Sequence, residues 1–215
     1  MDFLKDMEII PILPQKIFKF KCDDEILKEV QKHIVDEKFV LEGLSNKTKN
    51  FYLLKEDRYK SLHDWFHGCL IQVKKYHNFF CEDIKITQSW ANSSTYQQSF
   101  HVHAHPNSII SGIFYVNDSD TCTCFGRRSE WHYAPIDGGV DRCMWVSPTK
   151  NLNAYVLHKH KPKAGELVLF NSSLSHSVDV HKSKEKSRVT ISFNSFPSGK
   201  IGDPKNLTAI EIEVK

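Results

Sequence analysis

The stretch Ser99-Phe-His-Val-His-Ala-His-Pro-Asn-Ser108 carries histidines at the alternate positions 101, 103 and 105. Successive side chains of an extended strand point to opposite faces, so this spacing predicts a β-strand with three imidazoles on one side. A further histidine, His176, follows in a Ser-His-Ser context. Neutral imidazole is the commonest side-chain ligand of transition metals. The four histidines therefore predict a mononuclear metal site built from two separate parts of the chain.

An arginine follows the last of these histidines at a short distance. Arg188 lies twelve positions after His176. Its guanidinium stays charged and presents a planar fork of donors that matches a carboxylate. We expect Arg188 to hold an anionic co-substrate beside the metal.

The bulk composition is that of an ordinary globular protein. The chain has 215 residues, 40% of them hydrophobic and 26% charged, which suits one domain with a substantial core. The formal net charge of +3 is too small to indicate a nucleic-acid partner. The one dense basic run, His158 to Lys163, is more typical of a solvated loop than of a phosphate-binding patch.

The sequence also gives expectations about cellular location. The N-terminal residues lack the pattern of a secretory signal, and no apolar run is long enough to span a membrane. The six cysteines do not form the framework of a small disulfide-rich domain, so we expect a cytoplasmic protein with reduced thiols and no membrane partner. Cys122 and Cys124 have C-x-C spacing without a second pair, which favours small core residues over a metal pair.

The apolar periodicity divides the chain into a helical part and a strand-rich part. Met7 to Lys21 is typical of an edge strand, and helices are expected over Glu25–Glu37 and Tyr59–Phe80. Short strands are expected at Asp83–Ala91, Gln97–His103, Ile109–Asn117, Thr121–Phe125, Cys143–Val146, Glu166–Asn171, Ser187–Asn194 and Leu207–Val214.

This order predicts a single domain over residues 1–215. Residues 1–82 would form a helical support, and residues 83–215 a mainly β core, an antiparallel sandwich or barrel with the helices packed on one face. Residues 126–162 are rich in Gly, Pro and charge, so we expect a long loop that acts as a lid or selects the substrate.

Two blocks of sequence resemble the 2-oxoglutarate/Fe(II)-dependent dioxygenases. The first is His103-x-His105-Pro-Asn-Ser-Ile-Ile-Ser-Gly-Ile-Phe-Tyr-Val-Asn117. The second begins at Pro162-Lys-Ala-Gly165-Glu-Leu-Val-Leu-Phe170 and continues through His176 to Arg188-Val-Thr190-Ile-Ser-Phe-Asn194. The likeness covers roughly residues 83 to 196 and is similar in particular to a bacterial and phage subgroup of the prolyl-hydroxylase-like branch.

The resemblance implies a fold and a role for each matching residue. The fold would be a double-stranded β-helix, also called a jelly roll, with iron at its open mouth. His103 would be the first ligand and His176 the distal ligand. Arg188 would bind the far carboxylate of 2-oxoglutarate, helped by the hydroxyl of Thr190, and Tyr115 would occupy a position from which related hydroxylases bond the same carboxylate. For Trp90 and Asn92, on the preceding strand, two interpretations stay open: residues that line the pocket, or core and turn residues.

The second position of the first block departs from the family pattern. The family has His-x-Asp or His-x-Glu, and this chain has His105 instead. We expect His103, His105 and His176 to bind the metal together, because the resemblance aligns positions 103 and 105 with the usual pair. Two alternatives stay open: His101 with His103, leaving His105 behind the ligands, or a distant carboxylate from Asp118, Asp120 or Asp179.

The resemblance implies an oxygenase that uses Fe(II), 2-oxoglutarate and O2. It would hydroxylate an unidentified substrate and release succinate and CO2, with the substrate entering over the 126–162 loop near Trp131, Tyr133 and Trp145. The main alternative is a cupin-like metalloenzyme that has the same three histidines but does not use 2-oxoglutarate. A non-catalytic binding module is a further alternative. A zinc hydrolase is less favoured, because no Glu or Asp base accompanies the histidines.

Overall fold

A computed structural model describes residues 15–42, 45–126 and 156–214 of the chain. The helices are α1 (Asp24–Ile34) and α2 (Lys60–His77), with short 3-10 turns at Leu53–Lys55, Asp57–Tyr59 and Pro204–Asn206. The described strands are β1 (Ile17–Lys21), β2 (Phe39–Glu42), β3 (Ser45–Thr48), β4 (Cys81–Ser94), β5 (Phe100–His103), β6 (Ile110–Tyr115), β7 (Thr123–Gly126), β8 (Val156–His160), β9 (Glu166–Asn171), β10 (His176–Val178), β11 (Arg188–Ile201) and β12 (Ile210–Ile212).

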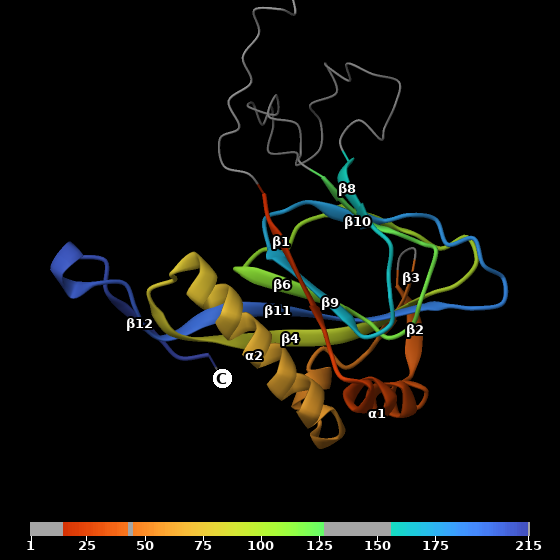
Figure 1. The fold of residues 1–215 in the computed structure, drawn as a ribbon, viewed down its shortest axis with the longest axis horizontal. Coiled ribbons are helices and arrows are strands. Elements are labelled where there is room, and N and C mark those ends of the chain that lie inside the picture. Colours follow the sequence, from red (N-terminus) through yellow and green to blue (C-terminus); the bar gives the residue numbers. More distant parts are fainter. Residues whose placement is uncertain (1–14, 43–44, 127–155, 215) are drawn as a thin grey trace, which may run out of the picture.

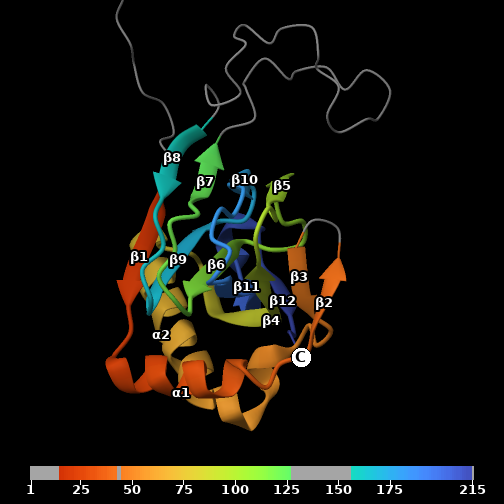
Figure 2. The same ribbon diagram turned by 90° about the vertical axis from the view of Figure 1, so that its right-hand side faces the viewer.

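The strands form two antiparallel sheets that share the chain between them. The major sheet has the order β1-β9-β6-β11-β4-β3-β2, with β12 paired to β11, and the minor sheet has the order β5-β10-β7-β8. From β4 to β11 the chain passes repeatedly from one sheet to the other, and eight strands in two such sheets make a jelly roll. Figures 1 and 2 show the minor sheet stacked on the major sheet and both helices on the opposite side of the major sheet. The predicted double-stranded β-helix with helices on one sheet is confirmed.

The two faces of the major sheet have different partners because side chains alternate along each strand. On β11, Ile191 and Phe193 face the helices, and the ring of Phe193 stacks on Phe66 of α2 at a centroid distance of 4.9 Å. The side chains at the alternate positions, Thr190 and Ser192, point the other way and line the space between the sheets. The outer face therefore holds the larger apolar core, and the inner face can carry polar groups.

The helices form as their apolar spacing predicts, and each buries one stripe. In α2 the buried residues are Leu62, Phe66, Cys69, Leu70 and Val73. The helix ends at Asn78, whose φ of 52° lies in the left-handed region that commonly terminates helices. In α1, acidic Asp24 and Glu25 occupy the first turn and basic Lys32 and His33 the last, which complements the helix dipole.

Several elements of the structure differ from the predicted ones, mostly at their boundaries. The first described residues contribute β1, β2 and β3 as well as the helices, so this part of the chain is not wholly helical. The predicted 126–162 loop contains strand β8 at its end, and the predicted strand Cys143–Val146 lies outside the described residues. Strand β10 was not predicted, because three residues are too few to show an alternation.

The described residues contain neither a membrane-spanning helix nor a disulfide bond. Among their helices, none has the length and apolar character needed to cross a bilayer. The five cysteines in this part of the chain are all free thiols. Cys124 is buried and Cys122 is half-buried.

Gly112 offers a direct test of how tightly the helices pack on the major sheet. A Cβ atom at this position would lie 2.3 Å from the Phe193 ring, because the two residues are direct partners on β6 and β11. We expect Gly112→Ala to lower the free energy of unfolding by roughly 1–3 kcal/mol through overpacking. Urea denaturation measures the change.

Gly68 is the matched control for that substitution. It lies in α2, and a Cβ atom there would meet nothing within 4 Å. Gly68→Ala should therefore raise the free energy of unfolding by about 0.5–1 kcal/mol through helix propensity. Equal effects of the two substitutions would contradict the close contact between Gly112 and the Phe193 ring.

Candidate metal centre

Pairing between β5 and β10 brings the distant histidines together. His103 at the end of β5 lies opposite His176 at the start of β10, and their ring centroids are 4.2 Å apart. His105 follows β5, and its backbone N–H donates to the carbonyl of Ser172 at 2.9 Å. Its ring lies 5.1 Å from that of His103 and 5.0 Å from that of His176. One ligand atom from each histidine lies within 4.8 Å of the others, a cluster that can hold one metal ion.

Hydrogen bonds leave the same nitrogen available on two of the histidines. The Nδ1 of His103 is 2.9 Å from the backbone carbonyl of His101, and the Nδ1 of His176 is 3.1 Å from that of Leu174. A carbonyl oxygen can only accept, so both Nδ1 atoms carry the proton in the neutral ring. The Nε2 atoms of these two residues are therefore free of a proton and available to a metal.

A polar network behind His105 orients the third ring. Its Nδ1–H donates to the side-chain oxygen of Asn194 at 2.5 Å, and the Ser111 hydroxyl is 3.0 Å from the same nitrogen. Ser111 is linked in turn to Ser172 at 2.8 Å, and Ser172 to Ser108 at 2.7 Å. This hydroxyl chain fixes the ring and its tautomer, which is how metal-binding histidines are usually supported.

Burial keeps all three imidazoles neutral near pH 7. Desolvation, with smaller contributions from neighbouring charged groups, lowers the pKa of His103 to about 4. Desolvation together with the other two rings lowers the pKa of His176 to about 3. Burial also lowers the pKa of His105. The site is therefore ready for a cation, because no proton must first leave these rings at pH 7.

Arg188 opens β11 and is buried on the same side of the barrel. Its side chain is 3% exposed, and its Nη2 donates to the Thr123 hydroxyl at 2.7 Å. Its Nε has no hydrogen-bond partner among the described residues, and no carboxylate there forms an ion pair with it. Thr123 pairs with Val178, two residues along β10 from His176. A buried cation without a counter-ion is costly, so this arrangement favours an anionic ligand between Arg188 and the histidines.

Tyr115 and Thr190 flank Arg188 in different ways. The Tyr115 hydroxyl is 2.8 Å from the Thr123 hydroxyl, and the Arg188 guanidinium lies over the Tyr115 ring at 5.4 Å. Tyr115 thus contacts the groups that orient the guanidinium. Thr190 lies on the same face of β11 as Arg188 and lines the space between the sheets.

The three histidines, Arg188 and Thr190 line one cavity of about 430 Å³. Trp90 and Asn92 of β4 line it, the first of the two roles that the sequence left open, and the Trp90 ring lies 5.9 Å from that of His105. The described lining residues are mostly neutral and polar, with Lys47 and Arg188 as the cations and no Asp or Glu among them.

The remaining predicted residues lie outside the cluster of three histidines. His101 lies in β5 two residues before His103, with its ring 5.7 Å from that of His103, but it is exposed and outside the cluster and contributes only its backbone carbonyl. β5 ends at His103, so His105 joins the cluster from beyond the end of the strand. Each of the three candidate carboxylates has another partner: Asp118 accepts from the Ala164 N–H, Asp120 pairs with Lys161, and Asp179 pairs with Lys159. Trp131, Tyr133 and Trp145 lie outside the described residues.

Sequence reasoning missed Thr123 and Asn194. Both carry a contact that matters only once the chain is folded: Thr123 accepts from Arg188, and Asn194 accepts from His105. Asn194 does belong to the second sequence block, so its place two strand periods after Thr190 was a usable signal. Thr123 gave none.

The chain resembles a known sequence family and several solved structures. Residues 88–194 match the family described as "Putative 2OG-Fe(II) oxygenase", a span that contains every candidate ligand and co-substrate residue. No curated protein matches the chain in a sequence search.

Solved structures with the same fold include several enzymes that use 2-oxoglutarate. HygX from Streptomyces hygroscopicus, with nickel and 2-oxoglutarate bound, is 11% identical over 85% of this chain and 83% of its own, with a TM-score of 0.61. The epimerase SnoN from nogalamycin biosynthesis is 10% identical over 88% and 79%, with a TM-score of 0.64. A Pseudomonas putida prolyl-4-hydroxylase is 11% identical over 86% and 94%, with a TM-score of 0.57.

Such low identities establish the fold, and the family match adds the chemistry. The match covers the segment that carries the three clustered histidines and the buried arginine. The subgroup found in bacteria and phages stays a prediction. The chain belongs to the 2-oxoglutarate/Fe(II)-dependent oxygenases, which use Fe(II), 2-oxoglutarate and O2.

Proposed function

We propose that this oxygenase is a hydroxylase in which His103, His105 and His176 hold Fe(II) and Arg188 holds the far carboxylate of 2-oxoglutarate. The observation that carries the proposal is the buried Arg188, which has no carboxylate partner among the described residues, lining one cavity with three neutral imidazoles. When bound, iron and 2-oxoglutarate supply the oxidising chemistry: O2 provides one oxygen atom to a substrate C–H bond and one to succinate, with loss of CO2.

The residues present fit that metal and that co-substrate. Three neutral nitrogen donors suit Fe(II), and they leave both of its positive charges for a dianion to balance. Thr123, which contacts Arg188, lies two residues along β7 from Phe125, the partner of His176. Two residues of a strand span about 7 Å. A five-carbon dicarboxylic acid can bridge that separation with one end at the metal and the other at Arg188.

The side chains around the site orient the metal ligand His105 and the Arg188 guanidinium, and others line the space for the substrate. Asn194 holds the His105 ring, and Thr123 and Tyr115 hold the guanidinium. The polar side chains of β4, including Gln88 and Asn92, line the rest of the cavity and would meet the substrate. The choice of hydroxylation rests on the likeness to the prolyl-hydroxylase branch, since the solved relatives also include an epimerase and a carbocyclase.

The proposed reaction is tested by Fe(II)-dependent conversion of 2-oxoglutarate to succinate under 18O2, with a metabolite extract as the source of substrate. A hydroxylase should give a product that gains one 18O atom, and succinate should carry the other. A product that forms without gaining oxygen would overturn hydroxylation and leave the oxygenase family intact.

Arg188 should control the affinity for 2-oxoglutarate. Removing one partner of a buried charge pair costs roughly 2–5 kcal/mol, so Arg188→Gln should weaken binding to the Ni(II)-loaded protein by about 30-fold or more. Arg188→Lys keeps the positive charge but loses the two-pronged guanidinium, so its affinity for 2-oxoglutarate should lie between those of the wild type and Arg188→Gln. Calorimetric titration measures each Kd. Arg58→Gln, which removes an arginine near α2, is the control, and equal loss in both glutamine variants would contradict the assignment.

Asn194 should control metal affinity through His105. Without its oxygen the His105 Nδ1–H loses an oriented acceptor, and loss of such a contact typically weakens metal binding by about 10- to 100-fold. We expect this result for Asn194→Ala in a Ni(II) titration, while Asn92→Ala, which lines the same cavity but bonds to Ser192, should change the Kd little. An unchanged Kd in Asn194→Ala would remove His105 from the proposed ligand set.

The lowered pKa values of the histidines predict how the stability of the metal-free protein depends on pH. Between about pH 6.5 and pH 4 the unfolded chain binds protons at His103 and His176 that the folded protein does not, so stability falls as pH falls. Each group contributes a slope approaching about 1.4 kcal/mol per pH unit.

The measurement is urea denaturation in the presence of a chelator from pH 7.5 to pH 4.5. His176→Gln should show a shallower loss of stability on acidification than the wild type. Identical slopes in the two proteins would contradict a buried, neutral His176.

A further inference from the structure

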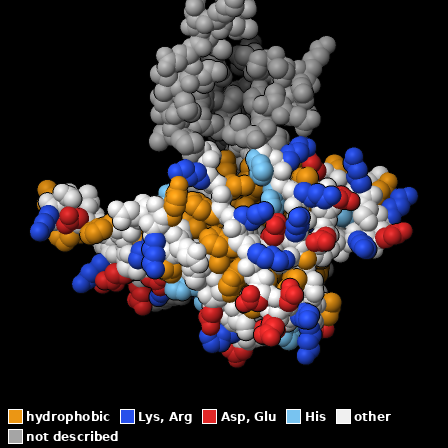
Figure 3. Space-filling view, in the orientation of Figure 1, with side chains coloured by type: hydrophobic (Ala, Val, Ile, Leu, Met, Phe, Trp, Pro, Cys, Tyr) orange, Lys and Arg blue, Asp and Glu red, His pale blue; other side chains and the backbone are white. Residues whose placement is uncertain are grey.

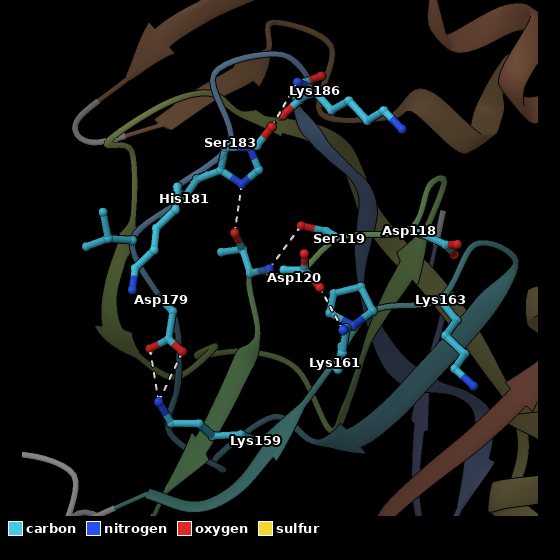
Figure 4. A pocket seen from close by; sticks show the side chains of 15 residues that line it. Asp118, Ser119, Asp120, Lys159, Lys161, Lys163, Asp179, His181, Ser183 and Lys186 are labelled. Carbon is cyan, nitrogen blue, oxygen red and sulfur yellow. Dashed lines mark hydrogen bonds and ion pairs between the residues drawn. The ribbon is translucent and has the colours of Figure 1, made fainter.

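A second, larger hollow adjoins the histidine cavity, since Asp179 and Ser187 line the hollow while their chain neighbours Val178 and Arg188 line the cavity. Its volume is about 910 Å³, and its walls come from three loops, at residues 118–121, 159–163 and 179–187 (Figure 4). It shares no lining residue with the histidine cavity. We call it the lysine hollow, after the lysines that line it: Lys159, Lys161, Lys163, Lys182 and Lys186.

The lysine hollow forms because two basic runs, separate in sequence, meet in space. The run His158 to Lys163, which alone is typical of a solvated loop, lies beside the run Lys182 to Lys186. Figure 3 shows basic side chains interspersed with acidic ones over this end of the molecule. Five lysines against three aspartates give the lining a formal charge of +2, out of +3 for the whole chain. The excess positive charge is therefore concentrated here.

Two of the five lysines have a structural role. Lys159 pairs with Asp179 at 3.1 Å, which joins the end of β8 to the loop after β10. Lys161 pairs with Asp120 at 2.6 Å, which joins the loop after β8 to the loop after β6. Figure 4 shows both pairs on the wall of the hollow. Both pairs are exposed, so they connect the three loops but add little to their stability.

A buried histidine fixes the floor of the hollow. His181 is 3% exposed; its Nε2–H donates to the Lys186 carbonyl at 2.6 Å, and its Nδ1 accepts from the Thr121 hydroxyl at 2.7 Å. The loop that carries Lys182 and Lys186 is therefore anchored to the loop that carries Thr121. A ligand would meet a shape that is already formed, which lowers the entropic cost of binding.

Apart from Asp118, whose carboxylate accepts from the Ala164 N–H, the charged groups left on the wall are lysine ammonium donors. Lys163, Lys182 and Lys186 are exposed, and within the described part of the chain none of them has an ion pair or a side-chain hydrogen bond. The hydroxyl oxygens of Ser119 and Ser183 each accept a backbone N–H, so each retains its own hydrogen to donate. Ammonium and hydroxyl donors around one hollow suit an anion with several oxygen atoms.

We propose that the lysine hollow is a binding site for a small phosphorylated ligand, separate from the oxygenase site, with its phosphate oxygens bound by Lys163, Lys182 and Lys186. Phosphate offers more acceptor oxygens and more charge than a carboxylate, and the ammonium group binds it as a point charge. The hollow is large enough to take more than one phosphate group.

The test is calorimetric titration of the full-length chain with pyrophosphate and inorganic phosphate at constant ionic strength. Wild type should bind pyrophosphate saturably at one site. The triple variant Lys163→Gln, Lys182→Gln, Lys186→Gln should bind it at least about tenfold more weakly, since each partly exposed ion pair contributes only modestly. The control variant Lys28→Gln, Lys32→Gln, Lys75→Gln loses the same charge from exposed positions on α1 and α2 and should stay within about twofold of wild type.

Three results would overturn the proposal. The first is no saturable binding of either phosphate probe to wild type. The second is an equal loss in both triple variants, which would mean diffuse attraction to net charge. The third is binding of a short single-stranded oligodeoxynucleotide alone, which would make the surface one for nucleic acid. Amide chemical shifts of Ser119 and Ser183 in wild type should move with pyrophosphate, and this measurement does not depend on any variant folding.

Discussion

The pairing of β5 with β10 is the constraint on which the site depends. It sets His103 against His176, residues far apart in sequence, at a centroid distance of 4.2 Å. The same pairing fixes where the chain leaves β5, and this places His105 beside Ser172 and Asn194. A shift of one residue in this register would turn His103 to the other face of the minor sheet and separate the three rings.

The major sheet supports that arrangement because its larger apolar core packs against the helices, while its inner face combines a smaller apolar cluster, including Ile113 and Phe170, with the polar groups of the site. Phe66 of α2 and Phe193 of β11 lie in the apolar core on one side, with Gly112 opposite Phe193. On the other side, Arg188 and Thr190 face the minor sheet across the cavity. A buried guanidinium next to neutral imidazoles is unfavourable in isolation, and the apolar core is what allows the fold to retain it until an anion binds.

The sequence was informative where local pattern and function coincide. The helices were predicted from apolar spacing, β9 was predicted at its observed bounds, and the clustered histidines and Arg188 were all singled out. Strands β2, β3, β8 and β10 were missed, because three- to five-residue strands with polar or mixed composition show no clear alternation. Strand periodicity alone does not account for His105, because β5 ends at His103 and His105 joins the cluster from beyond that end.

What could not be predicted arises from contacts between distant segments. Thr123 accepts from Arg188 across 65 positions, and His105 meets Asn194 across 89. The lysine hollow has the same origin, since each basic run alone has the composition of a solvated loop. The place of Asn194 in the second sequence block was a usable signal, whereas nothing local marks Thr123 or the lysine hollow, because their partners depend on how the chain passes between the two sheets.

The most direct measurement of the ligand set is X-ray absorption of the protein loaded anaerobically with one equivalent of Fe(II). The account predicts multiple scattering from three imidazoles, provided by His103, His105 and His176, with the remaining positions occupied by oxygen. Two imidazoles and a protein carboxylate would contradict it, as would a spectrum that is unchanged when His105 is replaced.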